Sequence, residues 1–232
     1  MPQLKVMIVA DGDPDPQAMK RAHAPDGGSR PIVISADGGA HAAEAAGWLP
    51  DLIVGDADSL SDSDVERYRA LGVSVDLHPL EKDQSDTELA LDAALARDAA
   101  EIRLTGALGG PRIEHAIANL LLLADPRLDG RDVAIERGES TIRRIGTHDG
   151  PGSLHIRGTA GDFVSLLPLD AEVAGISTEG LRYLLIDETL TLGPTRGLSN
   201  ELLGDQAAVH TARGRLLVVH TPRSGRPTRD QE

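Results

Sequence analysis

Cysteine is absent from this chain of 232 residues, and aromatic residues are scarce. Without cysteine the protein can form neither disulfides nor thiolate metal sites, which fits a reducing cytoplasm. Apolar residues make up 40% of the sequence and aromatic residues only 2%, so we expect an aliphatic core of Ala, Val, Ile and Leu. The length suits one large domain or two modest ones.

Positive charge is also in short supply. The formal net charge is −14, whereas surfaces that bind nucleic acid or anionic membranes need an excess of Lys and Arg, so we expect neither partner. The first residues are interrupted by charge too early for a signal peptide, and no apolar run approaches the length of a membrane span. We expect a cytoplasmic protein in which metal ions and backbone N–H groups bind any phosphate ligand.

Apolar runs alternate with helical segments in the first part of the chain. The pattern predicts strands at residues 4–10, 31–35, 51–55, 73–77, 101–105 and 132–136, with helices between them, including a short one near residues 17–23. This alternation is typical of a parallel sheet with helices on both faces, a Rossmann-like α/β domain, which we place at residues 1–138. Ligands of such sheets bind at the carboxyl ends of the strands.

The pattern changes after residue 138, where short alternating runs are separated by Gly, Pro and Asp turns. We expect strands at residues 140–146, 153–158, 162–169, 181–187, 188–193, 206–212 and 215–220. These predict an antiparallel β domain over residues 139–220, a sandwich or a small barrel. The polar tail, 221–232, is expected to be disordered.

The stretch DLIVGDADS, residues 51–59, is the centre of the candidate site. An apolar strand ends there in Asp56 and Asp58, and side chains two apart in extended chain point to the same side. Two hard oxygen ligands suit Mg²⁺. A solvated turn, with Asp58 or Ser59 capping the next helix, explains this pair equally well when it is taken alone.

Acidic residues recur at other strand ends. Asp37 ends the second strand before a Gly-Gly step, and Asp83 and Asp86 follow Lys82 at the entrance of a helix. Asp37 could instead cap its helix, and acidic residues in a first turn are favoured by the helix dipole anyway. The recurrence at one edge of the sheet is what favours a metal site.

A glycine-rich loop, GALGG, follows the strand at residues 101–105 and leads into another helix. Free N–H groups and a positive dipole end make such a helix start suitable for an anion, and Arg112 and His115 lie in its first turn. Asn119 lies one turn further along the same face as His115. A structural role for His115 remains an alternative.

Together these features suggest phosphoryl transfer from a nucleotide. Mg²⁺ ions and cationic groups hold the phosphates in that chemistry, and the acceptor has only to be aligned. The chain has no GxxxxGK[ST] phosphate-binding loop.

Five motifs resemble those of the thiamine pyrophosphokinase family, in the same order and at similar spacings. They are ADGGA, GDADS, KDQSDTELA, GGPRIEH and GLRYLLIDETLTLGPTRGLSNE, and the resemblance runs from about residue 6 to residue 219. It implies an α/β domain that binds ATP, a β-sandwich that binds thiamine, and a homodimer with active sites at the subunit interface. The implied reaction moves the β,γ-pyrophosphate of ATP onto the hydroxyethyl oxygen of thiamine, giving thiamine diphosphate and AMP.

The resemblance also implies roles for individual residues. Asp56, Asp58, Asp83 and Asp86 correspond to Mg²⁺ and phosphate ligands, and Asp37, Asp58 and Asp86 to the catalytic carboxylates. Lys82, Gly109, Gly110, Arg112, His115 and Asn119 correspond to ATP contacts. Ser199 and Asn200 correspond to thiamine contacts, with Gly197 and Leu198 shaping the pocket, although a plain turn explains these residues equally well.

The sequence departs from the family pattern at two places. Pro111 is inserted before Arg112, and Glu114 replaces the usual Asp, which leaves the phosphate contact of Arg112 open. Some family members stack an aromatic ring on thiamine from the last strand, where this chain has His220, so Tyr183 is the alternative ring. We consider two other functions: a diphosphokinase with another acceptor, such as a pterin alcohol, and a non-catalytic nucleotide or thiamine sensor.

Overall fold

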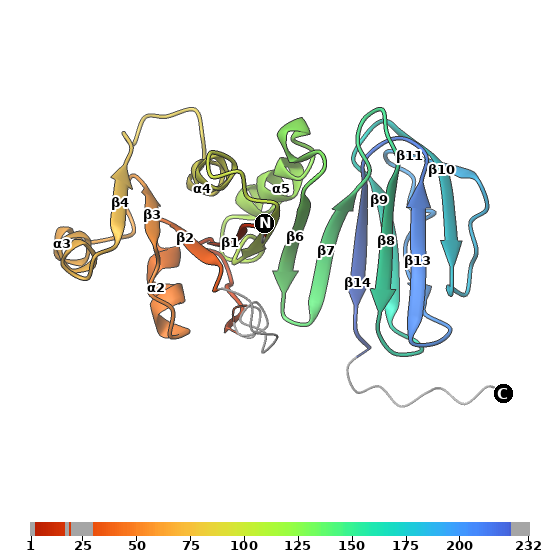
Figure 1. Ribbon diagram of the computed structural model, residues 1–232, viewed down its shortest axis with the longest axis horizontal. Coiled ribbons are helices and arrows are strands. Elements are labelled where there is room, and N and C mark those ends of the chain that lie inside the picture. Colours follow the sequence, from red (N-terminus) through yellow and green to blue (C-terminus); the bar gives the residue numbers. More distant parts are fainter. Residues whose placement is uncertain (1–2, 17–18, 20–29, 224–232) are drawn as a thin grey trace. The chain divides into compact units, whose positions relative to one another are not determined.

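The structure is a computed structural model that describes residues 3–16, 19 and 30–223 (Figure 1). It divides into two compact units, Met1–Gly138 and Glu139–Glu232, which are described separately. The helix expected near residues 17–23, apart from Met19, and residues 224–232 of the tail expected at 221–232 lie outside the described residues. Within the described part of the chain, no helix is long and apolar enough to cross a membrane.

The first unit, here the α/β unit, is built on a parallel sheet. Its strands are β1 (Lys5–Val9), β2 (Ile32–Ala36), β3 (Leu52–Gly55), β4 (Ser74–Leu77), β5 (Glu101–Thr105) and β6 (Asp132–Arg137), in the order β6-β5-β1-β2-β3-β4. Every neighbouring pair among them is parallel. The expected parallel sheet is therefore confirmed.

The helices cover both faces of this sheet, as expected. They are α2 (Gly39–Ala45), α3 (Asp62–Ala70), α4 (Asp86–Leu95) and α5 (Ile113–Leu122), and a short η1 (Pro126–Leu128) precedes β6. The chain steps one way from β1 to β4 and then returns to the other side of β1, so right-handed crossovers place α2 and α3 opposite α4 and α5. Figure 1 shows α2 and α4 on opposite sides of the strands. This reversal opens a crevice beyond the carboxyl ends of β1 and β5.

Local sequence explains where the helices near the site begin. Ser61 forms a capping box with Asp64 at the start of α3, and the hydroxyl of Ser85 accepts a hydrogen bond from the Glu88 N–H at the start of α4. Asp86 is therefore the first residue of α4, and its carboxylate lies at the positive end of the helix.

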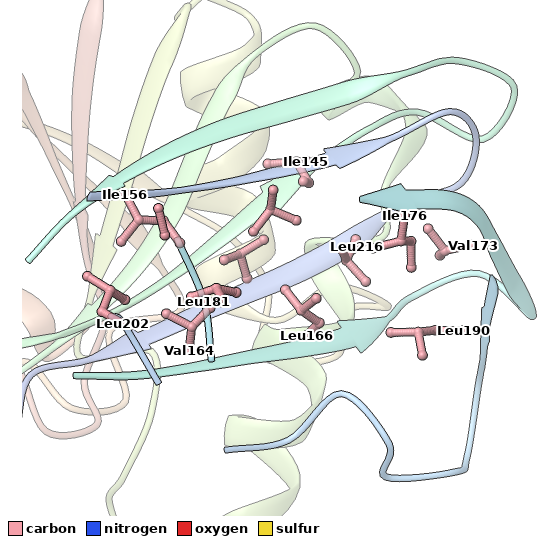
Figure 2. Close-up of a cluster of buried hydrophobic side chains, with 13 residues drawn as sticks. Ile145, Ile156, Val164, Leu166, Val173, Ile176, Leu181, Leu190, Leu202 and Leu216 are labelled. Carbon is pink, nitrogen blue, oxygen red and sulfur yellow. The ribbon is translucent and has the colours of Figure 1, made fainter. Parts of the chain in front are cut away.

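The second unit, here the β unit, is an antiparallel sandwich. Its strands are β7 (Ser140–Ile145), β8 (Gly152–Arg157), β9 (Phe163–Pro168), β10 (Glu172–Glu179), β11 (Glu188–Thr191), β12 (Asn200–Glu201), β13 (Gln206–Thr211) and β14 (Leu216–Thr221). One layer has the order β12-β9-β14-β7 and the other β11-β10-β13-β8. Aliphatic side chains from both layers fill the space between them, among them Ile145, Val164 and Ile176 (Figure 2).

Two expectations for the β unit are wrong. Residues 181–187 form a loop rather than a strand, and Tyr183, Leu184 and Ile186 are exposed on it. Strand β10 was not expected, because Gly175 breaks the alternation of its sequence. That glycine has a φ of 66° and lies in an irregularity of the β10–β11 register between Val173 and Ile176.

Candidate active site

Three carboxylates of the α/β unit converge at the carboxyl edge of its sheet. Asp37 follows β2, Asp56 follows β3, and Asp86 begins α4. Each offers one oxygen, and these oxygens all lie within 4.8 Å of one another. We call Asp37, Asp56 and Asp86 the carboxylate triad. Gly55 makes room for it, because a Cβ at that position would lie 3.0 Å from the Cβ of Asp37 and 3.2 Å from the Cγ of Asp86.

Asp37 is the most buried member of the triad, with 4% of its surface exposed. Its Oδ2 accepts a hydrogen bond from the Ser59 N–H at 2.9 Å, whereas its buried Oδ1 has no hydrogen-bond partner among the described residues. Burial raises the pKa of Asp37 to about 6, against the lowering effect of Ser59. A buried carboxylate oxygen without a donor is suited to a cation.

Lys82 supplies positive charge to the other two members. Its ammonium contacts Asp56 Oδ2 and lies 3.1 Å from Asp86 Oδ1. Burial alone would raise the pKa of Asp56, but the hydrogen bond and charge of Lys82 and the hydrogen bond from the Asp58 N–H together outweigh burial and hold this pKa below its usual value. For Asp86 burial prevails over Lys82 and raises the pKa of the carboxyl.

Asp58 and Asp83, the other expected metal ligands, lie outside the triad. Ala57 has a φ of 60°, so the chain turns between Asp56 and Asp58, and the Asp58 N–H donates to Asp56 Oδ1 at 3.2 Å. The expectation of an extended chain between Asp56 and Asp58 is therefore wrong, although Asp58 still lines the same cavity as Asp37 and Asp86. Asp83 is exposed, and it does not line the cavity described next. Metal ligation by Asp58 and Asp83 stays a prediction.

A cavity of about 330 Å³ opens beside the triad. Its walls include these residues: Asp11, Asp37, Asp58, Ser59 and Asp86 on the acidic side, and Gly106, Gly109, Gly110, Arg112, His115 and Asn119 from the glycine-rich loop and α5. The fold thus gathers most of the expected ATP contacts and the three expected catalytic carboxylates around one space.

Sequence reasoning missed Asp11, which follows β1 by two residues. The segment DGDPDP reads as a turn, and its position at the carboxyl end of a parallel strand was the signal that it faces the site. Burial and the nearby Asp58 raise the pKa of Asp11.

The glycine-rich loop packs directly against the chain that follows β1. The Gly12 N–H donates to the Gly106 carbonyl at 2.9 Å, and a Cβ on Gly106 would lie 2.1 Å from the Ala10 carbonyl oxygen. The Asn119 side chain, which is buried, donates to the Ala107 carbonyl at 2.8 Å. Close packing is therefore one reason for glycine here, and Asn119 positions the loop.

Arg112 precedes the first residue of α5 and points toward its own helix. Its Nε donates to Glu114 Oε1 at 2.8 Å, and both side chains are largely exposed. The hydrogen bond from Arg112 holds the pKa of Glu114 below its usual value. The two changes in the GGPRIEH motif thus meet at Arg112, since Pro111 comes before it and Glu114 binds it.

The expected thiamine contacts lie on the β unit. Asn200 is buried, and its side-chain amide makes hydrogen bonds with both backbone groups of Tyr183. Ser199 has a φ of 59°, and its N–H donates to the Ser165 hydroxyl at 3.0 Å. A Cβ on Gly197 would lie 2.2 Å from the Leu166 carbonyl oxygen, so this turn packs closely on β9.

The two rings considered for stacking differ in their surroundings. His220 Nε2 lies 3.0 Å from Asp162 Oδ2, and the His220 side chain is mostly buried. Tyr183 is 63% exposed, with the Arg182 guanidinium 5.7 Å from the centre of its ring.

Comparison with known proteins is consistent over both units. Residues 28–135 match the family described as "Thiamin pyrophosphokinase, catalytic domain", and residues 153–216 match "Thiamin pyrophosphokinase, vitamin B1 binding domain". Thiamine pyrophosphokinase of Bacillus subtilis (strain 168) is 27% identical over 191 residues, which are 82% of this chain and 87% of that protein.

Solved structures agree with these matches. Thiamin pyrophosphokinase from Geobacillus thermodenitrificans has a TM-score of 0.75 and 28% identity, covering 96% of this chain and 99% of that one. A thiamin pyrophosphokinase family protein from Enterococcus faecalis has a TM-score of 0.77 and 26% identity, covering 95% and 100%. Both units and the order of the motifs lead to one conclusion: the chain belongs to the thiamin pyrophosphokinase family of enzymes.

Proposed function

We propose that this protein transfers the pyrophosphoryl group of ATP to the hydroxyethyl oxygen of thiamine, giving thiamine diphosphate and AMP. The thiamine oxygen forms a bond to the β-phosphorus, the bond from that phosphorus to the α,β-bridging oxygen breaks, AMP leaves, and the hydroxyl proton is released. The observation that carries the proposal is the carboxylate triad beside a glycine-rich loop and a helix start, around one cavity. Asp37 and Asp86 are the candidate proton acceptors.

The triad fits a divalent metal ion. Three carboxylate oxygens lie close together, and the buried Asp37 Oδ1 has no hydrogen-bond partner within the described chain. Hard oxygen donors of this kind suit Mg²⁺, which we propose is held by Asp37, Asp56 and Asp86, with Asp58 and Asp83 as further predicted ligands. When bound, Mg²⁺ would neutralise charge on the phosphate oxygens.

The opposite wall of the cavity suits the phosphates of ATP. Backbone N–H groups around Gly109 and Gly110 and the start of α5 are available to anions, and Arg112 and His115 add side-chain donors. Arg112 must exchange Glu114 for a phosphate, which is inexpensive because both groups are exposed.

Thiamine is favoured over the other acceptors considered. The match of residues 153–216 to a vitamin B1 binding domain supports thiamine over a pterin alcohol. A non-catalytic sensor is less favoured, because the acidic residues of the site are all retained. We propose that Ser199 contacts thiamine, and that Asn200 contributes by holding the Tyr183 segment.

We also propose that the protein is a homodimer with active sites at the subunit interface. Helix α5 supports this, because Ile113, Ile117 and Leu121 recur at intervals of four and are 74%, 52% and 62% exposed. Such an apolar stripe on a surface helix is typical of an interface. The lack of cysteine fits our proposed cytoplasmic location.

One assay tests the proposed reaction. Purified protein is incubated with ATP and Mg²⁺, with and without thiamine, and AMP and thiamine products are separated by chromatography. We expect AMP and thiamine diphosphate in equal amounts, and only when both substrates and the metal are present. AMP without thiamine diphosphate, or a product only with another alcohol, would refute the proposal.

A further inference from the structure

The position of Lys82 in the carboxylate triad has a consequence for metal binding. Its ammonium contacts Asp56 Oδ2 and lies 3.1 Å from Asp86 Oδ1, so it lies between two members of the triad. The Lys82 and Asp56 side chains are only 14% and 8% exposed, so water screens this interaction weakly. Lys82 is therefore a built-in cation of the site.

The lysine and a metal ion need the same oxygen atoms. Asp56 Oδ1 already accepts the Asp58 N–H, and Asp37 Oδ2 already accepts the Ser59 N–H. The oxygens left for a cation are Asp37 Oδ1, Asp56 Oδ2 and the carboxylate oxygens of Asp86. Two of the oxygens in this set contact Lys82, so a metal ion held by Asp56 and Asp86 would have to displace the ammonium.

The residue type agrees with this role. The chain has 20 arginines but only three lysines, Lys5, Lys20 and Lys82. An ammonium is a compact point charge on a flexible stem, whereas a guanidinium is a planar fork that pairs bidentately with a carboxylate. A lysine ammonium can thus lie between two carboxylates, as a metal ion would, and can leave both of them by rotation of its flexible side chain.

We propose that Lys82 and the divalent metal ion compete for Asp56 Oδ2 and Asp86 Oδ1. Metal loading displaces the ammonium, which becomes available to a phosphate oxygen of the nucleotide. Lys82 thereby couples metal binding to nucleotide binding. The metal ion binds weakly by itself, and it binds more tightly when a nucleotide phosphate is present to pair with the displaced ammonium. The inference rests on the proposed function for the identity of the phosphate ligand, but the competition itself does not.

Metal binding in the absence of substrates tests the competition. Mn²⁺ is titrated into wild type and into Lys82→Met, which keeps a similar length and removes the charge, and free Mn²⁺ is measured by electron paramagnetic resonance. If the Lys82 ammonium occupies these oxygens in about nine-tenths of the molecules, only about one-tenth of the wild-type protein can bind Mn²⁺ at any moment. Removing the ammonium should then tighten Mn²⁺ binding about tenfold. Lys5→Met is the matched control, because it removes the same charge from a lysine paired with Glu101 at the other end of β1.

Tighter Mn²⁺ binding by Lys82→Met, with Lys5→Met close to wild type, supports the proposal. Equal or weaker binding overturns it. Should Lys82→Met not fold, nuclear magnetic resonance of wild type with isotope-labelled lysine tests the proposal instead. The Lys5→Met variant and a Lys20→Met variant each remove one of the three lysine side-chain signals, so the remaining signal is that of Lys82. The Lys82 signal must then shift when Mg²⁺ is added, and an unmoved signal overturns the proposal.

The outcome is separable from that of the proposed function. If wild type makes thiamine diphosphate but Lys82→Met binds Mn²⁺ no more tightly than wild type, only the proposed competition is wrong. If Lys82→Met binds Mn²⁺ more tightly than wild type but wild type makes no thiamine diphosphate, only the proposed reaction is wrong.

Discussion

Asn200 holds the backbone of Tyr183 from both sides. Its Oδ1 accepts the Tyr183 N–H at 2.9 Å, and its Nδ2 donates to the Tyr183 carbonyl at 2.6 Å. The same Oδ1 also accepts the Glu201 N–H at 2.9 Å. Asn200 is thus a positioning residue for a segment 17 residues away, and this segment carries three exposed apolar side chains: Tyr183, Leu184 and Ile186.

Asn200→Ala should therefore lower stability and thiamine affinity together. The partly buried backbone groups of Tyr183 lose their partners, which costs about 2 kcal/mol of unfolding free energy. We expect the KM for thiamine to rise while the KM for ATP changes little. Denaturant unfolding and steady-state kinetics measure the two effects.

Ser199→Ala separates the two roles, because it leaves the Asn200 amide in place. Its unfolding free energy should stay near that of wild type, whatever happens to its KM for thiamine. Equal destabilisation of both variants would contradict the positioning role of Asn200.

Gly106→Ala should destabilise the α/β unit strongly. The added Cβ would lie 2.1 Å from the Ala10 carbonyl oxygen, and the φ of Gly106 is 70°. We expect a loss of about 3 kcal/mol from the clash and the backbone strain together, measured by thermal or denaturant unfolding.

Gly130→Ala is the control for the strain alone. Gly130 has a φ of 79°, but a Cβ there would meet nothing within 4 Å. Its loss should be about 1 kcal/mol. If both variants lose the same amount, the packing of the glycine-rich loop against the chain after β1 is not what requires glycine at residue 106.

Much of this fold could be predicted from the sequence, because its apolar residues recur in a periodic pattern. Apolar runs alternating with helices predict a parallel sheet, and parallel strands end at one edge, which brings Asp37, Asp56 and Asp86 together. The failures lie where tertiary contacts decide. Nothing local indicates that the apolar segment around Tyr183 is a loop held by Asn200, or that β10 continues through the irregularity at Gly175.

The details of the site were less accessible for a related reason. The φ of 60° at Ala57, which breaks the extended chain between Asp56 and Asp58, belongs to a residue type that rarely adopts it. The approach of Lys82 to Asp56 joins residues 26 apart through the packing of the sheet. Sequence patterns show which residues reach an edge, but they do not show which atoms meet there.

Asp37→Asn should stabilise the metal-free protein at neutral pH. The folded-state pKa of Asp37 is raised from 3.8 to about 6, so the carboxyl favours folding when protonated and opposes it when ionised. The penalty is absent below about pH 4, grows as the pH rises to about 6, and is then complete at about 2 to 3 kcal/mol. In the presence of a chelator, the variant should be more stable than wild type at pH 7 and match it near pH 4.

Mg²⁺ should reverse this difference, because wild type gains stability from the ion and Asp37→Asn gains less. Unfolding measured with and without Mg²⁺ across this pH range checks both statements. Asp83→Asn makes the same change of charge at an exposed position and controls for the overall negative charge. A pH-independent difference between wild type and Asp37→Asn would show that burial of the charge is not its cause.

Ile117→Arg should weaken self-association. Ile117 is the middle residue of the exposed stripe on α5, and a guanidinium there would have to be desolvated in an interface between two copies. Sedimentation velocity should show a dimer for wild type and a shift toward monomer for the variant, with the same secondary structure by circular dichroism. Leu71→Arg is the matched control, since Leu71 is similarly exposed, at 51%, but follows α3. A wild-type monomer, or equal effects of the two substitutions, would show that α5 is not the interface. If α5 is the interface, thiamine diphosphate formation by Ile117→Arg should fall with its dimer fraction, because the proposed active sites form at that interface.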